Sequence, residues 1–318
     1  MSRRNWDIAV VVGVGLVMST TLVSAAADGL TKHLTGSFAP PQMYFFCGLV
    51  VAGMSLLMNR ATPALGPTGT LATRHGWMLA LRSALVLVSV VSYYHAFARL
   101  PLAEVFVFIG MMPLLAAILS RPVLGEAVAP AAWAALGAGA FGILFLFPQG
   151  LEGIGWGHLA AALGVGSGTL SLVLMRRMTK SEPNTLAQVF WPHAAMVAVM
   201  GAALPFVWQP MSLADVGLVA AYSTAVFAAR WLMVPALARL KAHVAMMLMN
   251  LQFVWMVVIG RAAFGEVPEA GTFIGAACII GAGCFLVLEQ ARTRGELPAR
   301  RPVSIPGVPS EPRLIPAE

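Results

Sequence analysis

Two arginines stand inside long apolar stretches of this sequence, where a charge is costly. Arg230 lies in the string Phe-Ala-Ala-Arg-Trp-Leu, beyond comfortable reach of the end of its apolar run. A charged side chain at the centre of a bilayer costs about 2.5–3.5 kcal/mol on insertion scales, so it usually has a function. We expect Arg230 to anchor an anionic or carboxylate group of a substrate, or a gating carboxylate. The alternative is a structural arginine that binds backbone carbonyls of a helix distorted by Pro235.

Arg82 shares a helical face with two further polar residues. Ser89 and Tyr93 follow it at seven and eleven residues, a spacing that places all three side chains on one side of a helix. A polar stripe in an otherwise apolar segment should face protein or water, which makes Arg82 and Tyr93 candidates for substrate contact. The alternative for Arg82 is a side chain whose long stem reaches to the membrane surface.

Histidine and glutamate residues in the apolar runs are candidates for proton or ion handling. His193 follows Pro192, and it could relay protons because histidine titrates near neutral pH. The alternative is a packing residue. Glu104 is a candidate ion-coupling carboxylate, or a residue that stabilises a helix N-terminus. Glu126 and Glu266 each follow a glycine, and we expect them to serve the fold at the start of the next helix.

Amide groups and a large ring occur together in the ninth apolar run. Asn250 and Gln252 could bind a substrate or could bond neighbouring helices. Trp255 lies in the middle of the run, away from the interfacial belt that tryptophan usually occupies, and we expect it to form a pocket wall. Pro113 is expected to break the fourth helix near the cavity, and the alternative is a kink that the helix tolerates.

The composition indicates that lipid is the solvent for most of the chain. Of 318 residues, 59% are hydrophobic and 10% charged, and the mean hydropathy is +0.82, whereas soluble domains carry roughly 25% charged residues. A helix needs about 20 apolar residues to cross a bilayer. Ten such runs occur, at about 8–28, 39–58, 76–98, 102–121, 129–148, 154–175, 185–206, 213–236, 243–263 and 270–289. The three cysteines lie in apolar runs and are expected to pack as small hydrophobes.

The positive charges orient these runs. With the N-terminus inside, fifteen Lys and Arg residues fall in cytoplasmic segments, and only Lys32, Arg99 and Arg261 fall outside. This positive-inside bias predicts cytoplasmic N- and C-termini. It explains the +7 formal charge by an anionic membrane face, so no nucleic-acid partner is expected.

The two halves of the chain repeat with a shift of 140 residues. Arg121 then falls on Arg261, and Gly125-Glu126 falls on Gly265-Glu266. Five helices per half is an odd number, so the second copy must cross the membrane in the opposite sense. We therefore predict an all-α integral membrane protein with ten transmembrane helices, arranged as two inverted five-helix repeats over residues 1–150 and 151–290. A cleaved signal peptide is the alternative for the first run, but its loss would spoil the repeat. Residues 291–318, rich in proline and arginine, are expected to form a disordered cytoplasmic tail.

Several strings resemble a known family, the EamA-like branch of the drug/metabolite transporter superfamily. The first string is the connection at residues 98–103 between the third and fourth runs. The second is Pro113 followed by residues 124–126, and the third, in the second half, is Trp255 followed by residues 264–266. The resemblance covers about residues 6–290. The first half, with Asp28 and Lys32, is most similar to the S-adenosylmethionine-type carriers. The resemblance implies a central cavity between the third, fourth, eighth and ninth helices, and it implies no metal or other cofactor.

These features together predict a carrier in the bacterial inner membrane. Inverted repeats are typical of alternating-access transporters, and no nucleotide-binding or catalytic motif is visible. We expect a secondary transporter of a small organic metabolite, zwitterionic or anionic, such as an amino acid or nucleoside derivative. An exporter of amphipathic drugs is the first alternative, and an intramembrane enzyme is an alternative from another class. The sequence leaves a homodimer open.

Overall fold

The computed structural model describes residues 3–61, 69–125, 130–146, 153–182, 184–239 and 248–296, in which all regular structure is helical. Lipid offers no hydrogen bonds to the backbone, so a helix, which satisfies its own backbone groups, is the favoured spanning structure. The helices are α1 (Arg3–Leu34), α2 (Pro40–Ala61), α3 (Gly76–Phe97), α4 (Leu102–Ile109), α5 (Met112–Leu124), α6 (Pro130–Leu144), α7 (Trp156–Ser181), α8 (Thr185–Val207), α9 (Leu213–Arg239), α11 (Leu251–Phe264) and α12 (Ala270–Glu296).

The helices lie over the apolar runs of the sequence: the fourth run carries two of them, α4 and α5, and each of the other nine runs carries one within the described residues. Within the described residues six helical stretches are long and apolar enough to cross a membrane: 11–34, 40–60, 76–97, 102–124, 156–179 and 186–207. Shorter apolar helices cover 213–229, 251–264 and 270–285. The chain is therefore a multi-pass membrane protein.

The first helix is longer than the sequence predicts. We expected the first span to end near residue 28, but α1 continues to Leu34. Lys32 lies in its last turn, where it is held by the carboxylate of Glu266 at 2.7 Å. The extension places Asp28 inside the helix rather than at its end.

The fourth apolar run forms two helices, as the position of Pro113 predicts. Helix α4 ends at Ile109, and α5 begins at Met112 with the proline in its first turn. Proline has no N–H to donate to the carbonyl four residues earlier, which is that of Ile109. In the second half the described residues 248–249 are helical, Asn250 forms a turn, and α11 follows. The two interruptions, near 110 and at 250, are separated by the repeat length.

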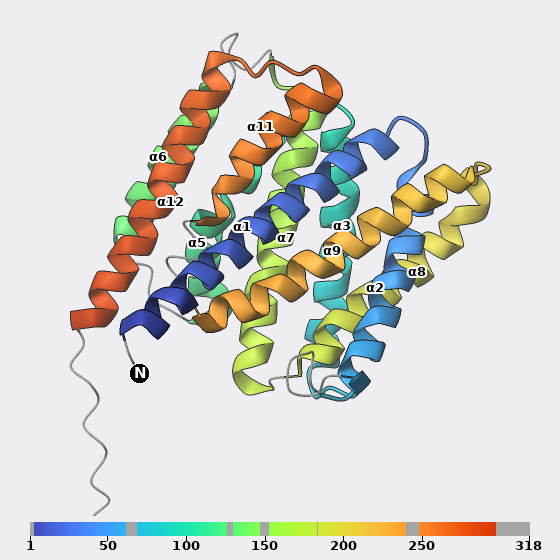
Figure 1. Cartoon of the computed structure of the whole chain (residues 1–318), viewed down its shortest axis with the longest axis horizontal. Helices are drawn as coiled ribbons and strands as arrows, with labels where there is room; N and C mark the ends of the chain where they lie inside the picture. The colour runs from blue at the N-terminus through green and yellow to red at the C-terminus, as the bar shows by residue number, and fades with distance from the viewer. Residues whose placement is uncertain are drawn as a thin grey trace, which may run out of the picture.

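Helices from the two halves of the chain pack against each other in pairs. Helix α3 lies along α7, and α1 lies along α9; Figure 1 draws the second pair crossing in front of the first. Helix α2 packs against α8, and α6 packs against α12 at the opposite edge of the bundle (Figure 1). The last pair meets through glycines, because a Cβ atom on Gly275 would lie 2.8 Å from the carbonyl oxygen of Gly142.

Two glycines end α5 and α11 in the same way. Gly125 and Gly265 have φ angles of 69° and 68°, the left-handed conformation in which glycine avoids the steric penalty of a Cβ atom. They are separated by 140 residues, so the sequence repeat coincides here with a repeated backbone conformation.

Candidate functional site

The polar stripe on α3 faces protein, as its spacing predicts. Arg82 donates to the Met175 sulfur on α7 at 3.5 Å, and Ser89 donates to the Gly164 carbonyl on the same helix at 2.8 Å. The ring of Tyr93 lies against Gly164, where a Cβ atom would be 3.1 Å from the nearest ring carbon. The stripe therefore forms the interface between α3 and α7.

Arg82 compensates for a proline in α8. Its Nη1 donates to the backbone carbonyl of Gln188 at 2.5 Å, and this carbonyl lies four residues before Pro192, which has no N–H for the usual helical bond. The side chain is 6% exposed, so it does not extend to the membrane surface. The contact gives Arg82 a structural role, and substrate contact by Arg82 stays a prediction.

His193 contacts a carbonyl of its own helix, and Glu104 contacts a histidine of α7. The His193 side chain is 3% exposed, and its Nδ1 donates to the Val189 carbonyl at 2.7 Å. Glu104, in the first turn of α4, lies 3.6 Å from Nε2 of His158 on α7. These positions suit packing and helix-end roles, and neither residue lies in the cluster described next.

Gln252 and Trp255 on α11 both contact α1. Nε2 of Gln252 donates to Oδ2 of Asp28 at 2.9 Å, and the indole N–H of Trp255 donates to the Thr21 hydroxyl at 3.2 Å. Gln252 is 8% exposed and follows the interruption at Asn250. The side chain of Asn250 contacts α12 instead, because its amide lies 3.6 Å from the Cys284 sulfur. The structure thus brings together two of the three predicted polar residues of this segment.

Tyr93 completes this cluster from α3. Its hydroxyl is buried without a hydrogen-bond partner among the described residues. Tyr93 and Trp255 pack against the same apolar cluster, which includes Ala25, Phe97 and Met256. We call Asp28, Gln252, Tyr93, Trp255 and Thr21 the α1/α3/α11 site.

Asp28 is the member of this site that sequence reasoning did not select. It was noticed as part of the family resemblance, but the expected end of the first span near residue 28 placed it at a membrane surface. The signal that could have found it is the pair Asp28 and Lys32, four residues apart and therefore on one helical face. Arg230, the residue we expected to matter most, lies in α9, but its side chain is outside the described residues.

A second polar contact ties helix ends together on the side of the bundle where α1 ends. Lys32 is paired with Glu266 at 2.7 Å and donates to the Leu100 carbonyl at 2.5 Å. The same glutamate accepts a hydrogen bond from the N–H of Leu102 at 2.9 Å. This N–H lies at the start of α4 and has no acceptor within its own helix. Glu266 therefore joins α1, α4 and α11, rather than serving the start of α12 as we expected.

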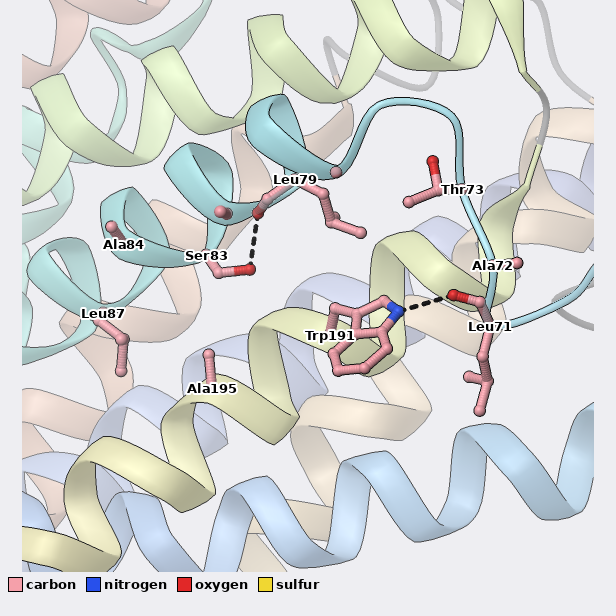
Figure 2. Close-up of a pocket in the computed structure, with 11 residues that line it drawn as sticks. Leu71, Ala72, Thr73, Leu79, Ser83, Ala84, Leu87, Trp191 and Ala195 are labelled. Atoms are coloured by element: carbon pink, nitrogen blue, oxygen red, sulfur yellow. Dashed lines mark hydrogen bonds between the residues drawn. The ribbon is translucent and has the colours of Figure 1, made fainter.

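Two open grooves lie elsewhere, on α3. One, of about 580 Å³, runs between α3 and α8 beside the 69–75 connection, with Trp191, Leu79, Ser83 and Ala195 among its lining residues. Figure 2 shows the indole of Trp191 directed at the Leu71 carbonyl, to which it donates at 2.8 Å. The other, of about 430 Å³, lies between α3 and α7. Neither coincides with the cavity that the family resemblance implies.

The connection beside the first groove is held by Glu182. Its carboxylate accepts from the Arg74 N–H at 3.0 Å and from the Thr73 hydroxyl at 3.1 Å, while Asn184 donates to the Ala72 carbonyl at 2.8 Å. The bond from the Arg74 N–H is the main reason that the pKa of Glu182 lies below its ordinary value.

Comparison with known proteins identifies the class of molecule. Residues 11–147 match the EamA-like transporter family. That part of the chain belongs to this family. The curated riboflavin transporter of Rhizobium johnstonii is 26% identical over 224 residues, which cover 69% of this chain and 73% of the relative. A solved structure described as a crystal structure of a protein superposes with a TM-score of 0.58 at 20% identity, over 89% of this chain and 97% of that one; it supports the fold alone. The EamA-like chain is thus a membrane transporter of small molecules.

Proposed function

We propose that this EamA-like chain is a secondary transporter that binds a small organic metabolite at the α1/α3/α11 site and moves it across the membrane by alternating access. The observation that carries the proposal is the Asp28–Gln252 hydrogen bond at the start of α11. It places a carboxylate and an amide beside an interrupted helix, in a chain of a transporter family. Interrupted helices near the bilayer midplane are where many secondary transporters bind substrate.

The packing of the helices supports alternation between two inverted halves, residues 1–150 and 151–290. Under the 140-residue shift the pair α3 and α7 corresponds to the pair α9 and α1, and both pairs make extensive contact. Helix α5 packs on α7, and its counterpart α11 packs on α1. A pseudo-two-fold axis that exchanges the halves would produce this pattern, and inverted repeats of this kind rock against each other during transport.

The Lys32–Glu266 contact supplies a gate in this account. It joins the ends of α1, α4 and α11 on the side that we assign to the outside, because the charge distribution predicts that both termini are cytoplasmic. We place the protein in the bacterial inner membrane with this orientation. In the described conformation the gate is closed, and opening it would expose the α1/α3/α11 site to the outside.

The substrate that fits best is an organic molecule with a flat part. The named relative is a riboflavin transporter, and Trp255 offers an aromatic wall beside the polar groups of Gln252 and Asp28. Whether the substrate also carries an anionic group, as in a zwitterion or a nucleoside derivative, depends on Arg230. An amino acid derivative fits the same description.

A cross-link across the gate tests the proposal. Lys32→Cys and Glu266→Cys in a chain without the three native cysteines should allow a short thiol-reactive cross-linker to join the two positions. Saturable flux of a solute, selected from a metabolite panel by thermal stabilisation of the purified protein, should disappear on cross-linking and return when a cleavable linker is reduced. Either single cysteine treated in the same way is the control. Full flux through the completely cross-linked protein would contradict alternating access.

A second candidate function is export of amphipathic drugs, favoured by the groove between α3 and α8. It is apolar, is open at the side of the bundle, and holds the fixed indole of Trp191 (Figure 2). A molecule dissolved in the bilayer could enter there. In that case Trp191→Ala would reduce drug efflux, whereas Gln252→Leu would leave it unchanged.

A further inference from the structure

The α1/α3/α11 site contains hydrogen-bonding groups whose capacity is not filled by the described residues. The Tyr93 hydroxyl is buried and unpartnered among them. Asp28 accepts one described bond, at Oδ2, and Gln252 uses one amide hydrogen to make it. Oδ1 of Asp28 and the carbonyl oxygen of Gln252 make no hydrogen bond to another described residue, and the Tyr93 hydroxyl is the atom of this site that is fully buried without such a partner. Since a buried polar group without a partner costs about 1–3 kcal/mol, a ligand that supplies the missing partners is favoured.

The described charges make this site rich in acceptors. No described cation lies within ion-pair distance of Asp28, and Lys32, one turn further along α1, is engaged by Glu266 and the Leu100 carbonyl. In its ionised form Asp28 would repel an anionic group, and it would accept a hydrogen bond from an N–H group.

The walls of the site are flat. Trp255 lies three residues after Gln252 and so on the same face of α11, and its hydrogen bond to Thr21 fixes the plane of the indole. Tyr93 stacks on Phe97, with ring centroids 6.2 Å apart and an angle of 29° between the planes. Aromatic walls with a few polar groups at one end are a common arrangement for planar ligands.

We infer that the site recognises a planar heterocycle with an N–H next to a carbonyl, an imide or lactam edge. Asp28 and the carbonyl oxygen of Gln252 accept from the N–H, while the Tyr93 hydroxyl donates to the neighbouring carbonyl. Trp255 lies against the ring. The inference rests on the proposed function, because it names the substrate class of the same site. It also separates the roles of Asp28 and Arg230. Asp28 binds the heterocycle, and any anionic substituent must lie away from Asp28, where Arg230 could bind it.

A comparison of ligands tests this without altering the protein. Riboflavin and uridine each carry one imide N–H, and N3-methylation removes it while leaving the ring and the sugar chain. Binding to the purified chain in nanodiscs is measured by quenching of riboflavin fluorescence and by calorimetry for uridine. At least one parent compound should bind, and its N3-methyl derivative should bind at least tenfold more weakly. Equal binding of parent and methylated ligand, or no binding of any of the four, would overturn the inference.

Variants locate the contact. Asp28→Asn and Tyr93→Phe should each weaken binding of the parent ligand by about tenfold or more. Each should also reduce the difference in affinity between the parent and the N3-methyl derivative, because one of the groups that recognises the imide edge is lost. Asp215→Asn is the matched control, since this carboxylate is exposed and bound to Ser212. Unchanged affinity and discrimination in both site variants would also overturn the inference. Saturable, cross-link-sensitive flux of a solute without such an edge would do so as well, while leaving the proposed function intact.

Discussion

The guanidinium of Arg82 on α3 donates to the backbone carbonyl of Gln188 on α8 at 2.5 Å, the acceptor that Pro192 leaves without its helical donor. The charged Arg82 in an apolar segment is thereby explained by a backbone hydrogen bond that is missing in the neighbouring helix α8. The same bond joins α3 of the first half to α8 of the second, and residues of these two helices line the groove drawn in Figure 2.

This relationship predicts a suppressor. Arg82→Leu should lower the free energy of unfolding by about 1.5–3 kcal/mol, because the Gln188 carbonyl loses a charge-assisted bond inside the bundle. Adding Pro192→Ala should recover a large part of that loss, since the new N–H at position 192 can bond to the same carbonyl. Thermal unfolding of the two single variants and the double variant measures the coupling. If Pro192→Ala gives no recovery, Arg82 has another role.

The contact between α6 and α12 predicts a position-specific effect of alanine. A Cβ atom on Gly142 would lie 2.7 Å from Cβ of Cys278 and 3.0 Å from the Gly275 carbonyl oxygen. Gly142→Ala should therefore destabilise the chain by about 1–3 kcal/mol through overpacking. Gly137→Ala on the same helix meets nothing within 4 Å, so it should be neutral or stabilising by up to about 1 kcal/mol. Equal unfolding temperatures for the two variants would contradict this packing.

Part of this architecture could be predicted from the sequence, for physical reasons that particular residues illustrate. The lengths of the apolar runs predicted where the helices lie, and Pro113 predicted the break in the fourth run. The spacing of Arg82, Ser89 and Tyr93 predicted a polar stripe, which the structure shows facing α7. Spacing along one helix cannot say which neighbour a side chain meets. The pairs Arg82–Gln188, Asp28–Gln252 and Lys32–Glu266 join residues about 100 to more than 200 positions apart, so they depend on tertiary packing.

The connection at residues 69–75 should loosen in acid. The pKa of Glu182 is lowered from its ordinary value of 4.5, chiefly by the hydrogen bond from the Arg74 N–H. A lowered pKa means that the carboxylate stabilises the folded connection fully above pH 4.5, and that the stabilisation is lost as the pH falls through the lower folded value. The protection factors of the amides of residues 69–75, which are the ratios of the intrinsic to the observed hydrogen-exchange rate at each pH, should therefore fall below about pH 4.5. Glu182→Gln should exchange faster at neutral pH and lose the acid step; an unchanged acid step would assign it to another group.

Arg230 remains the sharpest prediction from the sequence. If it binds an anionic group of the substrate, Arg230→Ala should abolish flux while the protein still folds. Arg230→Lys should rescue poorly, because a lysine lacks the planar fork of the guanidinium. The loss of one charge-assisted bond corresponds to roughly a ten- to hundredfold loss of affinity. A structural arginine would instead lower the unfolding temperature and leave the ligand affinity of the folded fraction unchanged.

The central claim, that a small solute crosses the membrane through the α1/α3/α11 site, is tested most directly by flux through Gln252→Leu in proteoliposomes. The solute is the one that most stabilises the purified wild-type chain, and flux is expressed per folded molecule. We predict saturable flux in the wild type and in the control Asp215→Asn, and at least a tenfold lower kcat/KM in Gln252→Leu, since leucine cannot bond to Asp28 or to the ligand. Wild-type kcat and KM in folded Gln252→Leu would contradict the account.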